Sequence, residues 1–220
     1  LYRIIVLSRN LTFDRSWDIS FCMDGRQQNV KTDKNQPVID FIEYLLRFLP
    51  NEYAPKKRAK IRSMLRELPY IRFDTESKEF YDFDFLPVGI PNYNINRKEF
   101  DSLFSDSFHE LLVMSPFLSD SVIRDFNNRN KYIEHSEYAL ITRASSLSKI
   151  KPESCSNFKI YTIKDEIIDG ESAVSEEDNT DIQKQDIHAK LYMVRKNSDT
   201  DLYLGSLNAS HNAVSGNVEF

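Results

Sequence analysis

The chain has few cysteines, no long apolar run and no nucleotide-binding glycine motif, and each absence excludes a class of protein. Its two cysteines, Cys22 and Cys155, lie far apart without C-x-x-C spacing, which excludes a disulfide framework and the usual zinc motifs. No apolar stretch approaches the roughly 20 residues that cross a bilayer, and no signal-peptide pattern stands at residue 1. Neither a P-loop nor G-x-G-x-x-G occurs. We therefore expect a cytoplasmic protein with no membrane segment, metal or bound cofactor.

The richest set of reactive side chains lies from residue 188 to residue 219, which read HAKLYMVRKNSDTDLYLGSLNASHNAVSGNVE. Apolar and polar residues alternate from 187 to 193, which predicts a strand that carries His188 and Lys190 on one face. Both side chains would then point into one site. Taken alone, His188 could equally be a strand histidine with locally satisfied hydrogen bonds.

A second polar cluster follows the next apolar run. Residues 202–204 predict a neighbouring strand that leads into Gly205, Ser206 and Asn208, where glycine lets a ligand approach the backbone closely. An imidazole can attack phosphorus or protonate a leaving oxygen, an ammonium and a carboxamide can hold non-bridging oxygens, and a carboxylate such as Glu219 can orient the imidazole. The glycine and serine alone could form a plain turn, but the ordered set favours a phosphate-sized pocket.

This order resembles the signature of the phospholipase D superfamily, which runs H-x-K, G-S-x-N and then Glu. The matching positions are His188, Lys190, Gly205, Ser206, Asn208 and Glu219. Lipid-cleaving members also carry an Asp five residues after the Lys, where this chain has Arg195. The chain is therefore more similar to the branch without that Asp, which includes tyrosyl-DNA phosphodiesterase and the metal-independent, phospholipase-D-type restriction nucleases.

The resemblance implies two similar halves with one motif each, and a covalent phosphohistidine intermediate. The first-half histidine usually attacks, so His188 would be the general acid and later the base; in a symmetric dimer, His188 itself could be the nucleophile. The resemblance also implies that Glu219 orients His188. The phosphate oxygens would be bound by Lys190, Asn208, Gly205, Ser206, Ser8 and Asn10.

The start of the chain aligns with part of this motif. Residues 4–21 align with residues 202–220, so that Ser8 falls on Ser206 and Asn10 on Asn208. Leu7 replaces the glycine, and Ser20 stands where the Glu would be, with Asp18 close by. No H-x-K can precede Ser8. We therefore expect a truncated first half, whose missing motif lies upstream in the same polypeptide or whose second histidine comes from another subunit.

The rest of the pattern predicts an α/β fold, namely a phospholipase D-like mixed sheet flanked by helices. We expect three domains: the end of the first half (1–21), a connecting helical and strand region (22–107) and the second half (108–220). The predicted strands are 70–73, 80–86, 111–115, 138–142 and 158–163. The predicted helices are 37–49, 55–68, 119–129 with Ser119 as its cap, 145–150 and 208–214.

Charge is unevenly distributed along the chain. Residues 165–186 carry nine acids and one lysine, a net charge of −8, so the remainder sums to +3 although the whole chain is −5. This segment is either solvated surface or a DNA-mimicking lid. The predicted helix 55–68 is basic, and Lys57, Arg58 and Arg62 could share a face that binds a phosphate backbone or is simply solvated.

Further polar and aromatic residues have two interpretations each. His211 follows Asn208 and could touch substrate or lie on a helix surface, and Ser115 could line the cleft. The aromatic side chains between residues 80 and 85 could stack on unpaired bases or belong to a core.

The sequence thus favours a metal-independent phosphodiesterase that acts on nucleic acid, with DNA the expected partner, as a nuclease domain of a larger protein. One alternative is a phospholipase or phosphatidyl transferase. Another is a non-catalytic nucleic-acid-binding module, which the degenerate positions Leu7 and Ser20 support.

Overall fold

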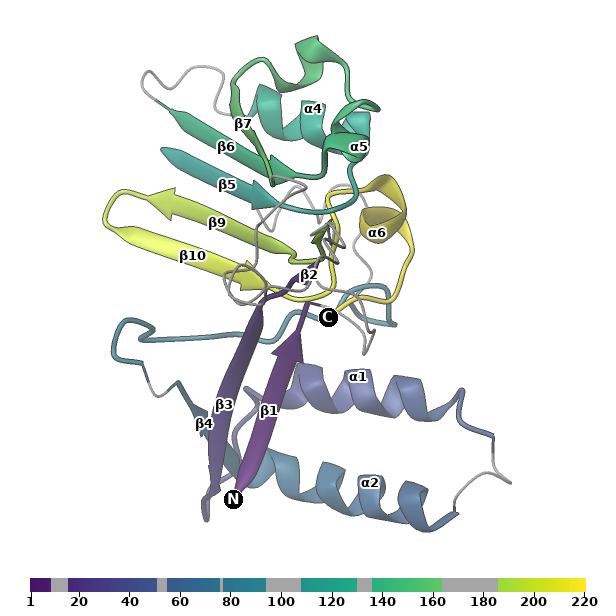
Figure 1. Ribbon diagram of the computed structural model, residues 1–220. Coiled ribbons are helices and arrows are strands. Elements are labelled where there is room, and N and C mark those ends of the chain that lie inside the picture. The colour runs from purple at the N-terminus through teal and green to yellow at the C-terminus, as the bar shows by residue number, and fades with distance from the viewer. Residues whose placement is uncertain (9–15, 51–54, 76, 94–107, 130–135, 164–185) are drawn as a thin grey trace, which may run out of the picture. The chain divides into compact units, whose positions relative to one another are not determined.

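The protein is a mixed α/β chain with more than one sheet (Figure 1). The computed structural model describes residues 1–8, 16–50, 55–75, 77–93, 108–129, 136–163 and 186–220. The chain divides into two compact units. Unit 1 comprises Leu1–Val6, Phe21–Ile95 and Gly216–Phe220, and unit 2 comprises Leu7–Ser20 and Asn96–Ser215.

Unit 2 is built on a five-stranded sheet in the order β10-β9-β5-β6-β7. Figure 1 shows these strands side by side. Strands β5 (Glu110–Met114), β6 (Glu137–Thr142) and β7 (Phe158–Thr162) run parallel, whereas β9 (Leu191–Lys196) is antiparallel to both β5 and β10 (Asp199–Leu204). These strands confirm those predicted at 111–115, 138–142, 158–163 and 202–204.

Helices and short elements complete unit 2. Helix α4 (Asp120–Asn128) connects β5 to β6, and its Phe126 ring lies 6.2 Å from the ring of Tyr192 on β9. Because Val122, Ile123 and Phe126 are all buried, α4 covers the sheet with one apolar face. The remaining elements are α5 (Ala144–Leu147), η2 (Pro152–Cys155), α6 (His211–Ser215) and the paired short strands β2 (Ser16–Trp17) and β8 (Asp186–Ile187).

The side chain of Ser119 differs from the expectation that it caps the helix that follows it. It makes no side-chain cap to α4. Its Oγ instead accepts a hydrogen bond from the backbone N–H of His211, 2.8 Å away, at the start of α6. Ser119 therefore occupies the predicted N-cap position of α4, but its hydroxyl bonds elsewhere because a helix distant in the sequence supplies an unpaired N–H to it.

Unit 1 combines a three-stranded sheet, in the order β1-β3-β4, with two helices. The strands are β1 (Tyr2–Leu7), β3 (Ser20–Gln27) and β4 (Ile71–Asp74), and the helices are α1 (Gln36–Leu46), α2 (Pro55–Glu67) and the 3₁₀ turn η1 (Leu68–Tyr70). Both predicted helices and the strand predicted at 70–73 are confirmed. Apolar side chains of α1, α2 and the sheet form one buried cluster.

The strand predicted at 80–86 is absent, because these residues pair with no other strand. Their aromatic rings pack in unit 1 instead: Phe83 and Phe85 lie 5.5 Å apart, and Phe85 lies 6.3 Å from Phe73. The side chain of Tyr81 remains exposed. The aromatic residues raised the predicted strand propensity of this segment. In the structure their side chains pack within unit 1, while their backbone joins no strand ladder.

Across the described ranges, none of the helices has both the length and the apolar character needed to cross a membrane.

Candidate functional site at one edge of the unit 2 sheet

The strand registers bring the ends of several strands together at one edge of the unit 2 sheet. Leu191, the first residue of β9, is paired with both Met114 and Leu204, the last residues of β5 and β10. Met114 is also paired with Ile141, near the end of β6. The residues after β5, β6 and β10 and those before β9 therefore share this edge, which is where ligands bind in many open α/β sheets.

The H-x-K segment enters this edge through a break in the strand. The sequence predicted one continuous strand from 187 to 193, but residues 188–190 separate β8 from β9. The backbone N–H groups of His188 and Ala189 both donate to the carbonyl of Trp17, each at 3.0 Å. Two successive donors on one acceptor interrupt a regular ladder, as in a β-bulge. Strict alternation is lost, since Ala189 and Lys190 are both buried.

Lys190 is a buried cation, with 7% of its surface exposed. Its Nζ donates to the carbonyl oxygen of Ser8 at 3.1 Å and to that of His188 at 2.6 Å. Both acceptors are neutral carbonyl oxygens. A buried ammonium attracts an anion strongly. Lys190 therefore joins the expected first-motif segment to the H-x-K segment.

The loop after β10 is fixed by buried hydrogen bonds. The hydroxyl of Ser115, directly after β5, accepts from the N–H of Ala209 at 3.0 Å and donates to the carbonyl of Phe117 at 2.9 Å. The hydroxyl of Tyr192 donates to the carbonyl of Leu207 at 3.0 Å. Ser115 thus holds the loop in place, a role that differs from lining a cleft.

The carboxamide of Asn208 has unused hydrogen-bonding capacity. Its Oδ1 is buried, and no hydrogen-bond partner for it is found within the described parts of the chain. Leaving a buried acceptor unpaired costs about 1–3 kcal/mol. Such a group therefore indicates a position where a bound molecule can supply a partner. Gly205 is buried and Ser206 half-buried in the same loop.

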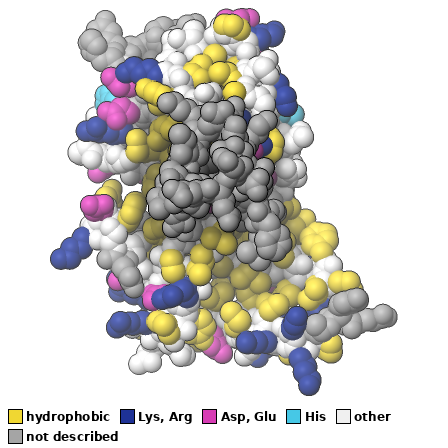
Figure 2. All heavy atoms as spheres, viewed as in Figure 1, with side chains coloured by type: hydrophobic (Ala, Val, Ile, Leu, Met, Phe, Trp, Pro, Cys, Tyr) yellow, Lys and Arg dark blue, Asp and Glu magenta, His cyan; other side chains and the backbone are white. Residues whose placement is uncertain are grey.

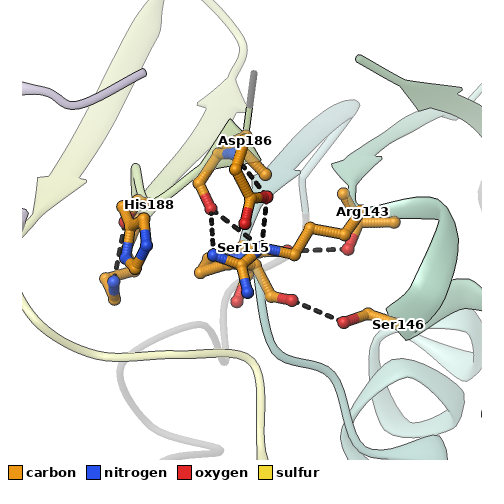
Figure 3. Close-up of polar contacts among 9 residues, drawn as sticks. Ser115, Arg143, Ser146, Asp186 and His188 are labelled. Atoms are coloured by element: carbon orange, nitrogen blue, oxygen red, sulfur yellow. Dashed lines mark hydrogen bonds and ion pairs between the residues drawn. The ribbon is translucent and has the colours of Figure 1, made fainter. Parts of the chain in front are cut away.

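Arg143 and Asp186 form a pair that sequence reasoning missed (Figure 3). The Nε of Arg143 lies 2.6 Å from Oδ1 of Asp186, and Nε and Nη2 donate to the carbonyl of Ile187 at 3.1 and 2.9 Å. The guanidinium also lies 4.8 Å from the ring of Phe117. Arg143 therefore fixes the backbone immediately before His188.

One signal could have found this pair. Arg143 directly follows the parallel strand β6, and polar residues at that end of a parallel strand often belong to a site. Asp186 is also the last acid of the acidic segment 165–186, and nothing in that pattern distinguishes it from the other eight. Figure 3 shows Arg143 extending toward Asp186, and it places Ser146 beside the loop after β5. The hydroxyl of Ser146 donates to the carbonyl of Pro116 at 2.6 Å and so anchors that loop.

The other predicted residues lie in several places. Ser8 is buried, and its Oγ accepts from the N–H of Ile19 at 2.9 Å and donates to Asp18 at 3.4 Å, so its hydroxyl holds residues 18 and 19. Asn10 and residues 164–185 lie outside the described residues. His211 is exposed at the start of α6.

Glu219 belongs to unit 1. Its backbone pairs with Val88 through hydrogen bonds of 2.8 and 3.0 Å, and its Oε1 accepts from Asn217 at 3.4 Å. Its side chain is mostly buried. The role of Glu219 in orienting His188 stays a prediction.

Within the described ranges, no group of three His, Cys, Asp or Glu side chains is arranged to hold a metal ion. A scan against protein-family models and a search of curated proteins both find no match to this chain.

Proposed function

We propose that this chain is a metal-independent phosphodiesterase that acts on nucleic acid, as its resemblance to the nuclease-like branch of the phospholipase D superfamily implies. One observation carries the proposal. The sheet edge of unit 2 gathers His188, the buried ammonium of Lys190 and the loop that holds Asn208. These are a proton carrier, a cation and a carboxamide, which together suit a phosphodiester.

The reaction would proceed in two displacements. In the first, a histidine nitrogen attacks phosphorus, the bond from phosphorus to the leaving oxygen breaks, and His188 gives its proton to that oxygen. In the second, His188 takes a proton from water, whose oxygen attacks phosphorus and breaks the phosphorus–nitrogen bond. Lys190 and Asn208 would stabilise the charge that develops on the non-bridging oxygens. In a symmetric dimer, His188 would instead attack.

The first experiment measures cleavage of labelled single- and double-stranded DNA in excess chelator. It compares the purified protein with its His188→Ala variant and with a matched variant, His109→Ala. His109 is exposed in the same unit, and its ring bonds to Asn197 at 3.2 Å. The two variants therefore each lack one histidine of unit 2. We expect His188→Ala to lose about 10²- to 10⁴-fold in rate, and His109→Ala to cleave as the unmodified protein does.

Other outcomes would contradict the proposal. Absence of cleavage by all three proteins would sink the nuclease assignment. Hydrolysis of phosphatidylcholine vesicles without DNA cleavage would establish a lipid substrate. DNA binding that survives His188→Ala, with no cleavage by any variant, would establish a binding module. A phosphorus label trapped on His188, by contrast, would support the symmetric-dimer form of the proposal and identify His188 as the nucleophile.

A further inference from the structure

Helix α2 is strongly basic, whereas α1, the other α-helix of unit 1, has no basic residue. Along its 13 residues α2 has six basic side chains and a single acidic one, Glu67. The basic residues are Lys56, Lys57, Arg58, Lys60, Arg62 and Arg66. The chain as a whole has a net charge of −5, so this concentration is local.

The buried side of α2 determines which cations are presented to solvent. Leu65 is buried, and Ile61 packs against the same apolar cluster. Arg58 lies on this side, because its guanidinium donates to the carbonyl of Leu49 and its Nε is buried. The face expected from the sequence therefore loses Arg58 to a contact within unit 1. Lys57 flanks the buried side, one turn before Ile61.

The exposed side of α2 carries two basic rows. Lys56 and Lys60 are four residues apart, as are Arg62 and Arg66, so each pair stacks one turn above the other. Ala59 and Ser63 lie between the rows by helical spacing. All four basic side chains are exposed. Figure 2, viewed as Figure 1, shows Lys and Arg side chains projecting from the region of α2.

These four cations are concentrated on one face of a single helix. Some exposed cations elsewhere are paired, as in Arg3 with Asp24 at 2.6 Å and Arg195 with Glu110 at 3.0 Å. Within the described residues, none of the four α2 cations takes part in an ion pair. Uncompensated like charges on one face repel each other, so an external polyanion would relieve the repulsion.

The spacing fits a phosphate backbone. From residue 56 to residue 66 the helix rises about 15 Å, and a DNA duplex carries roughly nine phosphate charges over that length. An interfacial membrane helix needs large apolar residues beside its cations. Met64 is exposed one turn after Lys60, but the small side chains of Ala59 and Ser63 occupy the space between the rows, which leaves room for a backbone to approach.

We propose that the exposed face of α2 (Lys56, Lys60, Arg62 and Arg66) is a phosphate-backbone contact that binds nucleic acid without regard to base sequence. This inference rests on the proposed function, because it names the surface that would hold the substrate of unit 2. Phosphate contacts fix the position of a protein on nucleic acid and add affinity that falls with salt.

The test measures binding of a labelled DNA duplex by fluorescence anisotropy from 50 to 200 mM salt, with every protein carrying His188→Ala so that the probe stays intact. The α2 variant changes Lys56, Lys60, Arg62 and Arg66 to Gln, a residue that favours helix. The matched control changes Arg72, Lys78, Lys149 and Lys151 to Gln, which removes the same charge from exposed positions elsewhere. Circular dichroism and thermal unfolding check that each variant folds.

Four phosphate contacts contribute a slope of about −3.6 to the logarithm of affinity against the logarithm of salt. We therefore expect that raising the salt from 50 to 200 mM lowers the DNA affinity of the control about 10²-fold more than that of the α2 variant. If the α2 variant does not fold, the double variant Lys60→Gln with Arg62→Gln should lose about half of that slope. Equal slopes for variant and control would overturn the inference.

Failures of the two proposals are distinguishable. Absence of cleavage that depends on His188 would count against the proposed function of unit 2 only. Equal salt slopes for the α2 variant and the control would count against the α2 surface only. No DNA binding by the unmodified surface at 50 mM salt would overturn the α2 inference outright. Reduced binding of the α2 variant to anionic lipid vesicles, with unchanged binding to DNA, would also overturn it and assign the face to a membrane.

Discussion

Among the described residues, the two units place polar side chains differently. Unit 2 buries hydroxyls and a cation at or near strand ends, namely Ser8, Ser115, Thr142, Ser146 and Lys190. Unit 1 encloses an apolar cluster, buries the polar side chains of Asn35 and Glu219, and keeps four cations of α2 exposed. Buried, hydrogen-bonded polar groups fix atoms in place, whereas exposed charges attract ligands over a distance. This difference agrees with the two proposals, in which unit 2 carries out the chemistry and unit 1 contacts a polyanion.

The largest effect should follow removal of the buried cation. Lys190→Met keeps a long side chain but removes the ammonium, and it leaves the carbonyls of Ser8 and His188 without this donor. We expect the cleavage rate to fall about 10²- to 10³-fold. The control is Lys159→Met, at an exposed lysine of the same unit. Equal cleavage rates for the two variants would show that the buried ammonium of Lys190 does not contribute to catalysis.

Arg143→Lys should have the next largest effect. Lysine keeps the charge beside Asp186 but cannot direct a planar guanidinium at both that carboxylate and the carbonyl of Ile187. We expect roughly a 10- to 100-fold loss in kcat from displacement of His188. The measurement compares kcat with thermal unfolding. A loss of stability with unchanged kcat would show that the pair only supports the fold.

Ser115→Ala tests how firmly the sheet edge holds the loop after β10. It would leave the N–H of Ala209 unpaired in a buried setting. We expect the free energy of unfolding to fall by about 1–3 kcal/mol. The matched change is Ser119→Ala. The Oγ of Ser119 accepts from the more exposed N–H of His211, so we expect its loss to lower the free energy of unfolding by about 1 kcal/mol or less. Urea unfolding measures both, and a larger loss at Ser119 would contradict this ranking.

The smallest effect concerns two carboxyl groups. In unit 1, the hydrogen bond from Arg3 lowers the pKa of Asp24; in unit 2, the N–H of Lys151 lowers the pKa of Asp120. Each group therefore contributes stability above its unfolded pKa, about 3.9, which is lost as pH falls through the lower folded value. NMR titration should show that added salt raises the pKa of Asp24 more than that of Asp120. The reverse would contradict the contrast, because backbone donors are screened less than an exposed ion pair.

Local pattern was enough to predict much of the fold. Helices α1 and α2 and strands β5 and β6 follow from apolar periodicity and prolines near helix starts, which depend on neighbouring residues alone. The strand break at 188–190 could not be predicted, because the carbonyl that causes it belongs to Trp17. The residues of the candidate site divide in the same way. His188, Lys190 and Asn208 follow from a motif, whereas Arg143 and Ser115 gain their partners only when the sheet forms.

The contact between Lys190 and Ser8 also has a consequence for folding kinetics. The two residues are 182 positions apart, so bringing them together closes a long loop, with a length-dependent entropic term of about 5 kcal/mol for a flexible chain. Contacts of such high sequence separation form slowly compared with helices and local hairpins. During synthesis, the carbonyl of Ser8 leaves the ribosome long before Lys190 can bind it. We therefore expect the ammonium to reach its buried position late in folding.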